Sequence, residues 1–108
     1  MQSESLNDQR EFPRKPCPGI MVLYTDQDQY YSDYIYDISE NGIFINTSAP
    51  IPVGSMISMS FLSFHNKGPI KIAGNVIRSL PRGIGVKFKV SEKPQKNALN
   101  AFIEGFLT

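Results

Sequence analysis

The stretch DISENG, residues 37–42, joins a tyrosine-rich run, YYSDYIY, to a short apolar run, IFI. Its last two residues, Asn41 and Gly42, are a strong signal for a hairpin, because both tolerate a positive φ in a tight turn. A turn needs only that pair. Asp37 and Ser39 therefore either hydrogen-bond the local backbone, as Asp and Ser often do, or have a function that the rest of the chain must explain.

The runs on both sides of this hairpin have the composition and alternation of β-strands. Six strands are expected, at about 20–25, 30–38, 42–46, 56–64, 70–80 and 84–90. Alternation in the second strand divides its side chains between two faces, with Tyr30, Tyr34, Tyr36 and Ile38 on one and Asp33 and Asp37 on the other. The five tyrosines of the chain most simply predict cross-strand packing, with a platform for base stacking as the alternative. Gly74 predicts a bulge or a close approach of two backbones.

After the last strand the hydrophobic period changes to that of a helix. Apolar residues recur on one helical face at Ala98, Leu99, Phe102, Ile103 and Phe106. Ser91 can cap this helix, and Pro94 is tolerable in its first turn. Six antiparallel strands and one C-terminal α-helix predict an all-β fold, a small closed or nearly closed barrel with the helix over an end or a seam.

The chain of 108 residues is predicted to form one domain, residues 17–108, preceded by a flexible N-terminal tail, residues 1–16. The tail is polar and carries two prolines, so it is expected to be extended and mobile unless something ties it down. No apolar run approaches the roughly 20 residues that a membrane span needs. The N-terminus also lacks the features of a secretory signal. The expected location is the cytoplasm, with no membrane span.

Charge is unevenly distributed along the chain, although the formal net charge is only +1. Between residues 17 and 66 there are five acids and no lysine or arginine, whereas residues 67–108 hold eight bases and two acids. A near-neutral total argues against binding of a nucleic-acid polymer, whose affinity comes mainly from neutralised phosphates. The segregation instead allows a small anionic ligand or an acidic partner to bind on one face.

The usual residues of catalytic and metal sites are missing from the sequence. His65 is the only histidine and lies in an expected turn, and Cys17, the only cysteine, lies between two prolines. Without a second histidine or a cysteine cluster, no metal site and no cofactor is predicted. Cys17 is interpreted as a small buried or half-buried residue rather than a nucleophile. The glycine-rich phosphate loop is absent as well, so the protein is not expected to be an enzyme.

Two arginines in the N-terminal tail, Arg10 and Arg14, form an R-x-x-x-R pattern. The pattern alone is weak, because a solvated basic patch would look the same. A guanidinium is nevertheless well suited to bidentate contacts with a phosphate or with the O6/N7 edge of guanine. The stretch 37–42 offers the complement. Asp37 can accept hydrogen bonds from the N1–H and N2–H₂ edge of guanine, and Ser39 can donate or accept beside it.

These two motifs, R-x-x-x-R in the tail and D-x-S-x-x-G after a strand pair, resemble those of the PilZ domain family. Further segments look like that family: IFI after the second motif, VG before the fourth strand, GNV in the fifth and IGVKF in the sixth. The resemblance implies a six-stranded β-barrel that binds the bacterial second messenger cyclic di-GMP. It also implies five ligand-binding residues, Arg10, Arg14, Asp37, Ser39 and Gly42. In that arrangement the arginines hold phosphate and guanine, Asp and Ser read a guanine edge, the glycine allows a close backbone approach, and the tail folds over the ligand.

The function implied by the resemblance is that of a single-domain cyclic di-GMP receptor and adaptor. Because no output domain is expected, it would signal through an unidentified downstream protein that controls motility, adhesion, biofilm formation or secretion. The alternative is a ligand-independent PilZ-like interaction module of the kind that serves type IV pilus assembly; the intact motifs favour the first. A small RNA-binding barrel is disfavoured by the acidic middle of the chain. Gln9 stands where many family members have a further arginine, which leaves open whether one ligand or a stacked pair binds.

Overall fold

The computed structural model of the chain describes residues 14–17, 19–62, 69–89 and 93–104. In chain order, these residues form the elements β1 (Lys15–Pro16), β2 (Met21–Thr25), β3 (Tyr30–Ile38), β4 (Gly42–Asn46), β5 (Met56–Leu62), β6 (Pro69–Leu80), β7 (Gly83–Lys89) and α2 (Lys93–Glu104). None of the helices in this part of the chain has the length and apolarity that crossing a bilayer requires.

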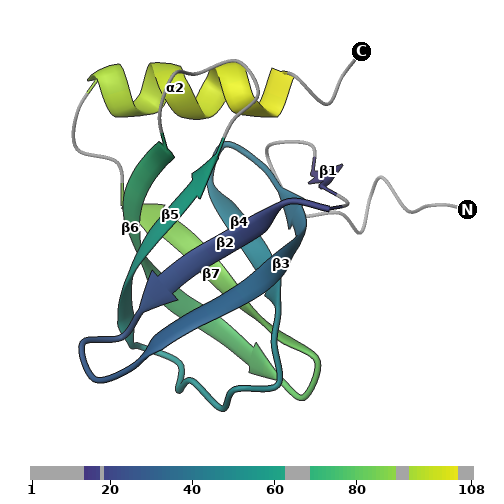
Figure 1. Cartoon of the computed structure of the whole chain (residues 1–108), viewed down its shortest axis with the longest axis vertical. Helices are drawn as coiled ribbons and strands as arrows, with labels where there is room; N and C mark the ends of the chain where they lie inside the picture. Colours follow the sequence, from purple (N-terminus) through teal and green to yellow (C-terminus); the bar gives the residue numbers. More distant parts are fainter. Residues whose placement is uncertain (1–13, 18, 63–68, 90–92, 105–108) are drawn as a thin grey trace, which may run out of the picture.

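Six of the strands form a closed barrel (Figure 1). Around it they follow the order β3-β2-β5-β6-β7-β4, and β4 pairs with β3 again to close the ring. Every pairing is antiparallel. Helix α2 lies across one end of the barrel in Figure 1. The predicted fold class, a six-stranded antiparallel barrel with one C-terminal helix, is confirmed, and the helix covers an end rather than a seam.

The core consists of the inward-facing side chains of these strands together with one face of α2. In β4 and β7, Ile43, Ile45 and Ile84 are at most 1% exposed, as strict alternation requires. The helix adds Leu99 and Phe102, each 1% exposed, so the open end of the barrel is filled from above. Full burial of such a side chain stabilises the folded chain by roughly 1.5–3 kcal/mol. Of the helix residues expected from the sequence, Ser91 and Phe106 lie outside the described residues, and Pro94 falls in the first turn.

A β-bulge in β3 overturns the predicted division of its faces. Ile35 pairs with Ile45 and Asp37 pairs with Phe44, so Tyr36 is an extra residue without its own partner in β4. The alternation slips by one at that point. Ile38 is therefore fully buried while Tyr36 is 59% exposed, although the sequence pattern placed them on one face.

The same slip separates the two aspartates of β3, which were expected to share a face. Asp33 pairs with the buried Val22, and its Oδ2 accepts a hydrogen bond of 2.7 Å from the hydroxyl of Tyr24. It therefore belongs to the inner side of the barrel wall. Asp37 comes after the bulge and lies opposite Phe44 on the outer side. The extra residue thus carries one carboxylate to the outer surface.

The hairpin at 37–42 forms as predicted, but its turn is of a different kind. Positive φ angles occur, among the described residues, at Gln27, Gly19 and Gly54, and not at the Asn-Gly pair. The turn is closed by the N–H of Ser39, which donates to the carbonyl of Gly42 at 2.8 Å. The glycine is required for another reason: a Cβ there would lie 2.4 Å from the carbonyl oxygen of Val86 in β7.

The close backbone approach predicted at Gly74 is confirmed, because a Cβ there would lie 2.7 Å from the carbonyl oxygen of Lys87. The bulge that the sequence offered as an alternative lies three residues further on. In β6 the register shifts between Val76 and Arg78, so Ile77 is the extra residue and is 57% exposed.

The chain before the first long strand is held against β3. Lys15 and Pro16, which the sequence assigned to the N-terminal tail, pair with Ile38 and Asp37 and form β1. The N–H of Cys17 then donates to the carbonyl of Tyr36 at 3.1 Å. These bonds place the residue before β1, Arg14, beside the carboxylate that the bulge turns outward.

Candidate functional site

The centre of the site is an ion pair between Arg14 and Asp37. The guanidinium reaches one carboxylate oxygen twice, with Nε at 2.9 Å and Nη2 at 2.8 Å from Oδ1. Both side chains are mostly buried, with 19% and 18% of their surface exposed. Because these hydrogen bonds are charge-assisted and partly shielded from water, they are stronger than those of a freely exposed pair. Two residues 23 positions apart are thereby held together.

Ser39 joins this pair and also shapes the local turn. Its Oγ accepts a hydrogen bond from Nη1 of Arg14 at 3.3 Å and another from the N–H of Asn41 at 3.3 Å. Ser39 as a whole is only 2% exposed. Ser39 thus makes the local contact expected of a turn residue and a second contact with the N-terminal arginine, whereas its contact with a ligand stays a prediction. With two bonds accepted at Oγ, the hydroxyl proton is available for a third.

The structure brings three of the five predicted ligand residues into direct contact and places a fourth beside them. Arg14, Asp37 and Ser39 form the bonded cluster, and Gly42 lines the same groove. Arg10 lies outside the described residues. Because Gly42 is needed for the packing of β4 on β7, its presence in the motif is explained by the fold before any ligand is considered.

A groove of about 790 Å³ opens from this cluster across the outer face of the barrel. It is lined by Arg14, Tyr36, Asp37, Ser39, Asn41, Gly42, Ile43, Phe44, Ile77, Arg78, Arg82, Gly85, Val86 and Lys87. Its volume lies in the range of roughly 300–1,000 Å³ that is usual for small-molecule sites. The groove therefore combines polar groups along its edges with apolar side chains between them, as small-molecule sites commonly do.

The floor of the groove follows one cross-strand row. Asp37 of β3 lies opposite Phe44 of β4, Phe44 lies opposite Gly85 of β7, and Gly85 lies opposite Arg78 of β6. The ring of Phe44 is 9% exposed, and Tyr36 meets it edge to face with 6.0 Å between the ring centroids. Gly85 places no side chain on the floor. Because Phe44 is largely covered in the free chain, a base can stack on its ring only when a neighbouring side chain moves aside.

Three further cations line the groove, and the motif-based prediction did not include them. Arg78, Arg82 and Lys87 are all exposed, and the guanidinium carbon of Arg82 lies 5.7 Å from the ring centroid of Phe44. The excess of bases after residue 66 was the signal that could have suggested them. Their common location could not be inferred from it, because closure of the barrel is what brings β6 and β7 next to β4 and β3.

Cys17 follows β1 and carries a buried thiol that is close enough to Asp37 and Arg14 to be affected by their charges. The thiol is fully buried, and its pKa is raised to about 12, first by burial and then by the nearby charge of Asp37, while Arg14 acts in the opposite direction. The thiolate is the reactive form, so a thiol with this pKa does not attack at neutral pH. The prediction that Cys17 is a small buried residue is confirmed.

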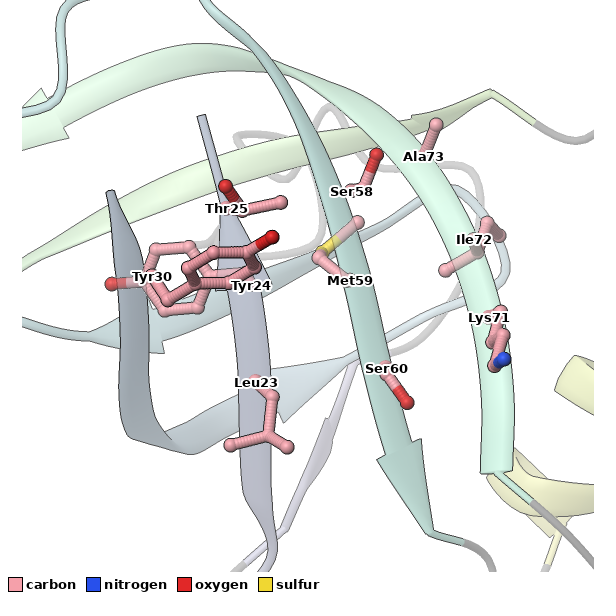
Figure 2. A pocket seen from close by; sticks show the side chains of 10 residues that line it. All are labelled: Leu23, Tyr24, Thr25, Tyr30, Ser58, Met59, Ser60, Lys71, Ile72 and Ala73. Atoms are coloured by element: carbon pink, nitrogen blue, oxygen red, sulfur yellow. The ribbon is translucent and has the colours of Figure 1, made fainter. Parts of the chain in front are cut away.

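A second pocket, of about 520 Å³, lies over β2, the first residue of β3, β5 and β6, and none of the predicted site residues lines it (Figure 2). In the strand order of the barrel this is the side opposite β4 and β7. Leu23 and Tyr30, which line it, are 56% and 88% exposed. Tyr24 stacks on Tyr31 with 5.0 Å between the centroids, as the cross-strand prediction requires. Tyr30 does not follow that prediction, because it is largely exposed and no ring contact with another aromatic residue is found for it among the described residues.

Comparisons with solved structures identify the same architecture elsewhere. The PilZ domain of CeSA from a cellulose-synthesizing bacterium is 17% identical, with a TM-score of 0.72 over 89% of this chain and 99% of that one. The PilZ domain of YcgR from Escherichia coli, solved with c-di-GMP, is 14% identical, with a TM-score of 0.73 over 93% of this chain and 92% of that one. At these identities the likeness establishes the fold.

A further match is the complex of MrkH from K. pneumonia with c-di-GMP, at 16% identity and a TM-score of 0.72. It covers 93% of this chain but only 53% of that one, so the chain spans about half the length of this larger protein. No curated protein sequence matches the chain. The PilZ domain model, in contrast, matches residues 8–105, which is nearly the whole sequence and includes both motifs. The chain therefore belongs to the PilZ domain family.

Proposed function

We propose that this chain is a cytoplasmic receptor domain for cyclic di-GMP that signals through a downstream protein. The observation that carries the proposal is the bonded cluster of Arg14, Asp37 and Ser39 at the edge of a groove with an aromatic floor. Family membership supports the same ligand class, because the PilZ domain of YcgR and the protein MrkH were both solved with c-di-GMP. A cyclic dinucleotide has the two features that the groove complements, flat bases and anionic phosphates.

The cluster can recognise guanine without losing its internal ion pair. Both nitrogens of Arg14 that reach Asp37 use the same oxygen, Oδ1, and among the described residues no hydrogen bond reaches Oδ2. Oδ2 can therefore accept from one donor of the guanine N1–H and N2–H₂ edge while Oδ1 keeps Arg14 in place. In this arrangement Asp37 both reads the base and orients the arginine that meets the O6/N7 edge or a phosphate.

The N-terminal segment supplies the second arginine of the motif. We propose that Arg10 contacts the same dianionic ligand and that the segment before β1 closes over the groove when the ligand is bound. Ordering backbone costs roughly 1–2 kcal/mol per residue. Arg14 is already held by Asp37 and Ser39, so only the few residues around Arg10 are expected to become fixed on binding. A local change of this kind would give a downstream protein a surface that exists only in the bound state.

Isothermal titration calorimetry with cyclic di-GMP tests the proposal. Wild type is expected to bind, and Arg14→Ala should weaken binding by one to two decades, because a charge-assisted contact is worth about 1.5–3 kcal/mol. Lys89→Ala is the matched control, since Lys89 is an exposed base of β7 outside the groove lining. Absence of heat and of any thermal stabilisation with saturating cyclic di-GMP would contradict the proposed function.

The second candidate function is a ligand-independent interaction module. The observation that favours it is the exposed apolar side chains on β2 and β3, among them Leu23, Tyr30 and Tyr34, which lie away from the groove. Exposed aromatic side chains of this kind are common in protein–protein interfaces. The two candidates differ in one measurable respect. A module that acts without ligand would capture its partner equally well with and without added cyclic di-GMP.

A further inference from the structure

The far side of the groove, away from Arg14, carries an unbalanced positive charge. Arg78 lies opposite Gly85 at the end of the floor row, Lys87 lies opposite Gly42, and Arg82 occupies the turn between β6 and β7. Among the described residues none of these three cations is paired with a carboxylate. They line the same groove, so their charges repel one another unless water or an anion lies between them.

The two sides of the groove differ in what they offer an anion. The charge of Arg14 is largely offset by Asp37, because their ion pair is close and mostly buried. The three cations of β6, β7 and their turn have no such carboxylate partner among the described residues. Attraction for a phosphate is therefore stronger on their side of the floor, where it needs no rearrangement of an existing ion pair.

The spacing of the two sides suits one ligand that spans them. From Asp37 to Arg78 the row crosses three strand spacings of about 4.8 Å each, which gives roughly 14 Å along the barrel surface. Between them lie Phe44 and Gly85, which leave the floor flat. A base seated at Asp37 and stacked above this floor would direct the rest of its nucleotide toward the far side.

We propose that Arg78, Arg82 and Lys87 form a second anion-binding site, which takes a phosphodiester phosphate of the ligand across the floor from Arg14. The identity of that ligand rests on the proposed function; the anion site itself does not. Arg82 has an additional part, because its guanidinium lies over the Phe44 ring in the free chain. A guanine base can take the place of the Arg82 guanidinium on the Phe44 ring, and the guanidinium then contacts the phosphate. The ring thus exchanges a cation–π contact for a stacked base.

The first arm of the test is titration of cyclic di-GMP into the variants Arg78→Ala, Arg82→Ala and Lys87→Ala, with Lys89→Ala as the control. Each of the three is expected to weaken binding by about tenfold, which is the loss of one charge-assisted contact. The dependence of affinity on salt should also become less steep, because fewer charges meet the ligand. Lys89→Ala should retain wild-type affinity and salt dependence.

The second arm uses inorganic pyrophosphate, which carries the phosphate chemistry without bases. In ¹H–¹⁵N NMR spectra of the wild-type chain, pyrophosphate should shift the amide signals of Arg78, Arg82 and Lys87, and the double variant Arg78→Ala/Lys87→Ala should abolish these shifts. The spectrum of the double variant also reports whether it is folded. Both substituted side chains are exposed, so the fold is expected to persist.

The outcomes separate the inference from the proposed function. Binding of cyclic di-GMP that is unchanged in all three variants overturns the second anion site and leaves the receptor function standing. Pyrophosphate shifts at the three residues without any binding of cyclic di-GMP support the anion site and overturn the receptor function. Absence of both responses overturns both.

Discussion

The glycine of the D-x-S-x-x-G motif gives the sharpest prediction of stability. A Cβ at Gly42 would lie 2.4 Å from the carbonyl oxygen of Val86, whereas real Cβ contacts are essentially never under 3.0 Å. The alanine variant must therefore push β4 and β7 apart by at least the difference, about 0.6 Å, at a ladder that closes the barrel. The atom met is backbone, so no side chain can rotate away.

The expected cost of Gly42→Ala follows from overpacking. Forcing an extra carbon into a packed site typically costs about 1–3 kcal/mol, and the rigid backbone neighbour places this variant at the upper end. For a domain of this size each kcal/mol lowers the melting temperature by about 4–8 °C, which predicts a fall of roughly 10–20 °C. Thermal and urea unfolding followed by circular dichroism measure it.

Gly85→Ala is the matched variant, because it makes the same chemical change at a position with room for a Cβ. Gly85 lies two strands away from Asp37 in the same cross-strand row. A Cβ there would lie 3.4 Å from Cβ of Arg78 and 3.8 Å from Cδ1 of Phe44, both ordinary contacts. Its stability should be equal to that of wild type or up to about 1 kcal/mol higher, through reduced freedom of the unfolded chain. Equal melting temperatures for Gly42→Ala and wild type, or a large loss for Gly85→Ala, would refute this account of the two glycines.

Two further predictions concern the cluster and the nearby thiol. Asp37→Ala should lower the free energy of unfolding by about 1–2 kcal/mol, since it leaves a mostly buried guanidinium unpaired. In calorimetry the variant should also show a smaller preference than wild type for cyclic di-GMP over cyclic di-AMP, because cyclic di-AMP offers no equivalent pair of donors. Equal wild-type affinity for the two ligands would exclude base reading by Asp37. Burial raises the pKa of Cys17 from 9.0 to about 12, so the thiol stays protonated in the folded chain while the unfolded chain ionises. Its contribution to stability is complete below pH 9 and is lost as the pH rises toward 12, by at most about 1.4 kcal/mol per pH unit. The difference in unfolding free energy between wild type and Cys17→Ala should narrow over that range, and a difference that stays constant would show that the thiol is not buried in this way.

The elements of the fold could be predicted because each depends on a local pattern. The alternation in β7 and the helical period of α2 follow from burial of one face, and closure of the barrel does not alter either. The motif residues could also be singled out from the sequence, since a turn requires neither Asp37 nor Ser39. In the structure both contact Arg14, the second arginine of the other motif.

What could not be predicted depends on pairing between strands. The extra residue at Tyr36 is defined by the register of β3 on β4, which no pattern within β3 records, so Ile38 was assigned to the wrong face. The turn at the Asn-Gly pair is governed by contact of β4 with β7, not by the turn propensity of its residues. The convergence of Arg78 and Lys87 on the groove likewise appears only when the ring of strands is closed.

The bulge at Tyr36 makes the recognition surface depend on the parity of a residue count. Side chains of a regular strand change sides with every residue, so Asp33 and Asp37, four residues apart, would share one side of the barrel wall. The extra residue is what lets Asp33 face inward and Asp37 face outward. Deletion of Tyr36 alone would leave the two aspartates three residues apart, so regular pairing of β3 with β4 would keep each of them on its present side. The letters of the motif therefore specify a binding surface only together with the register of β3 on β4.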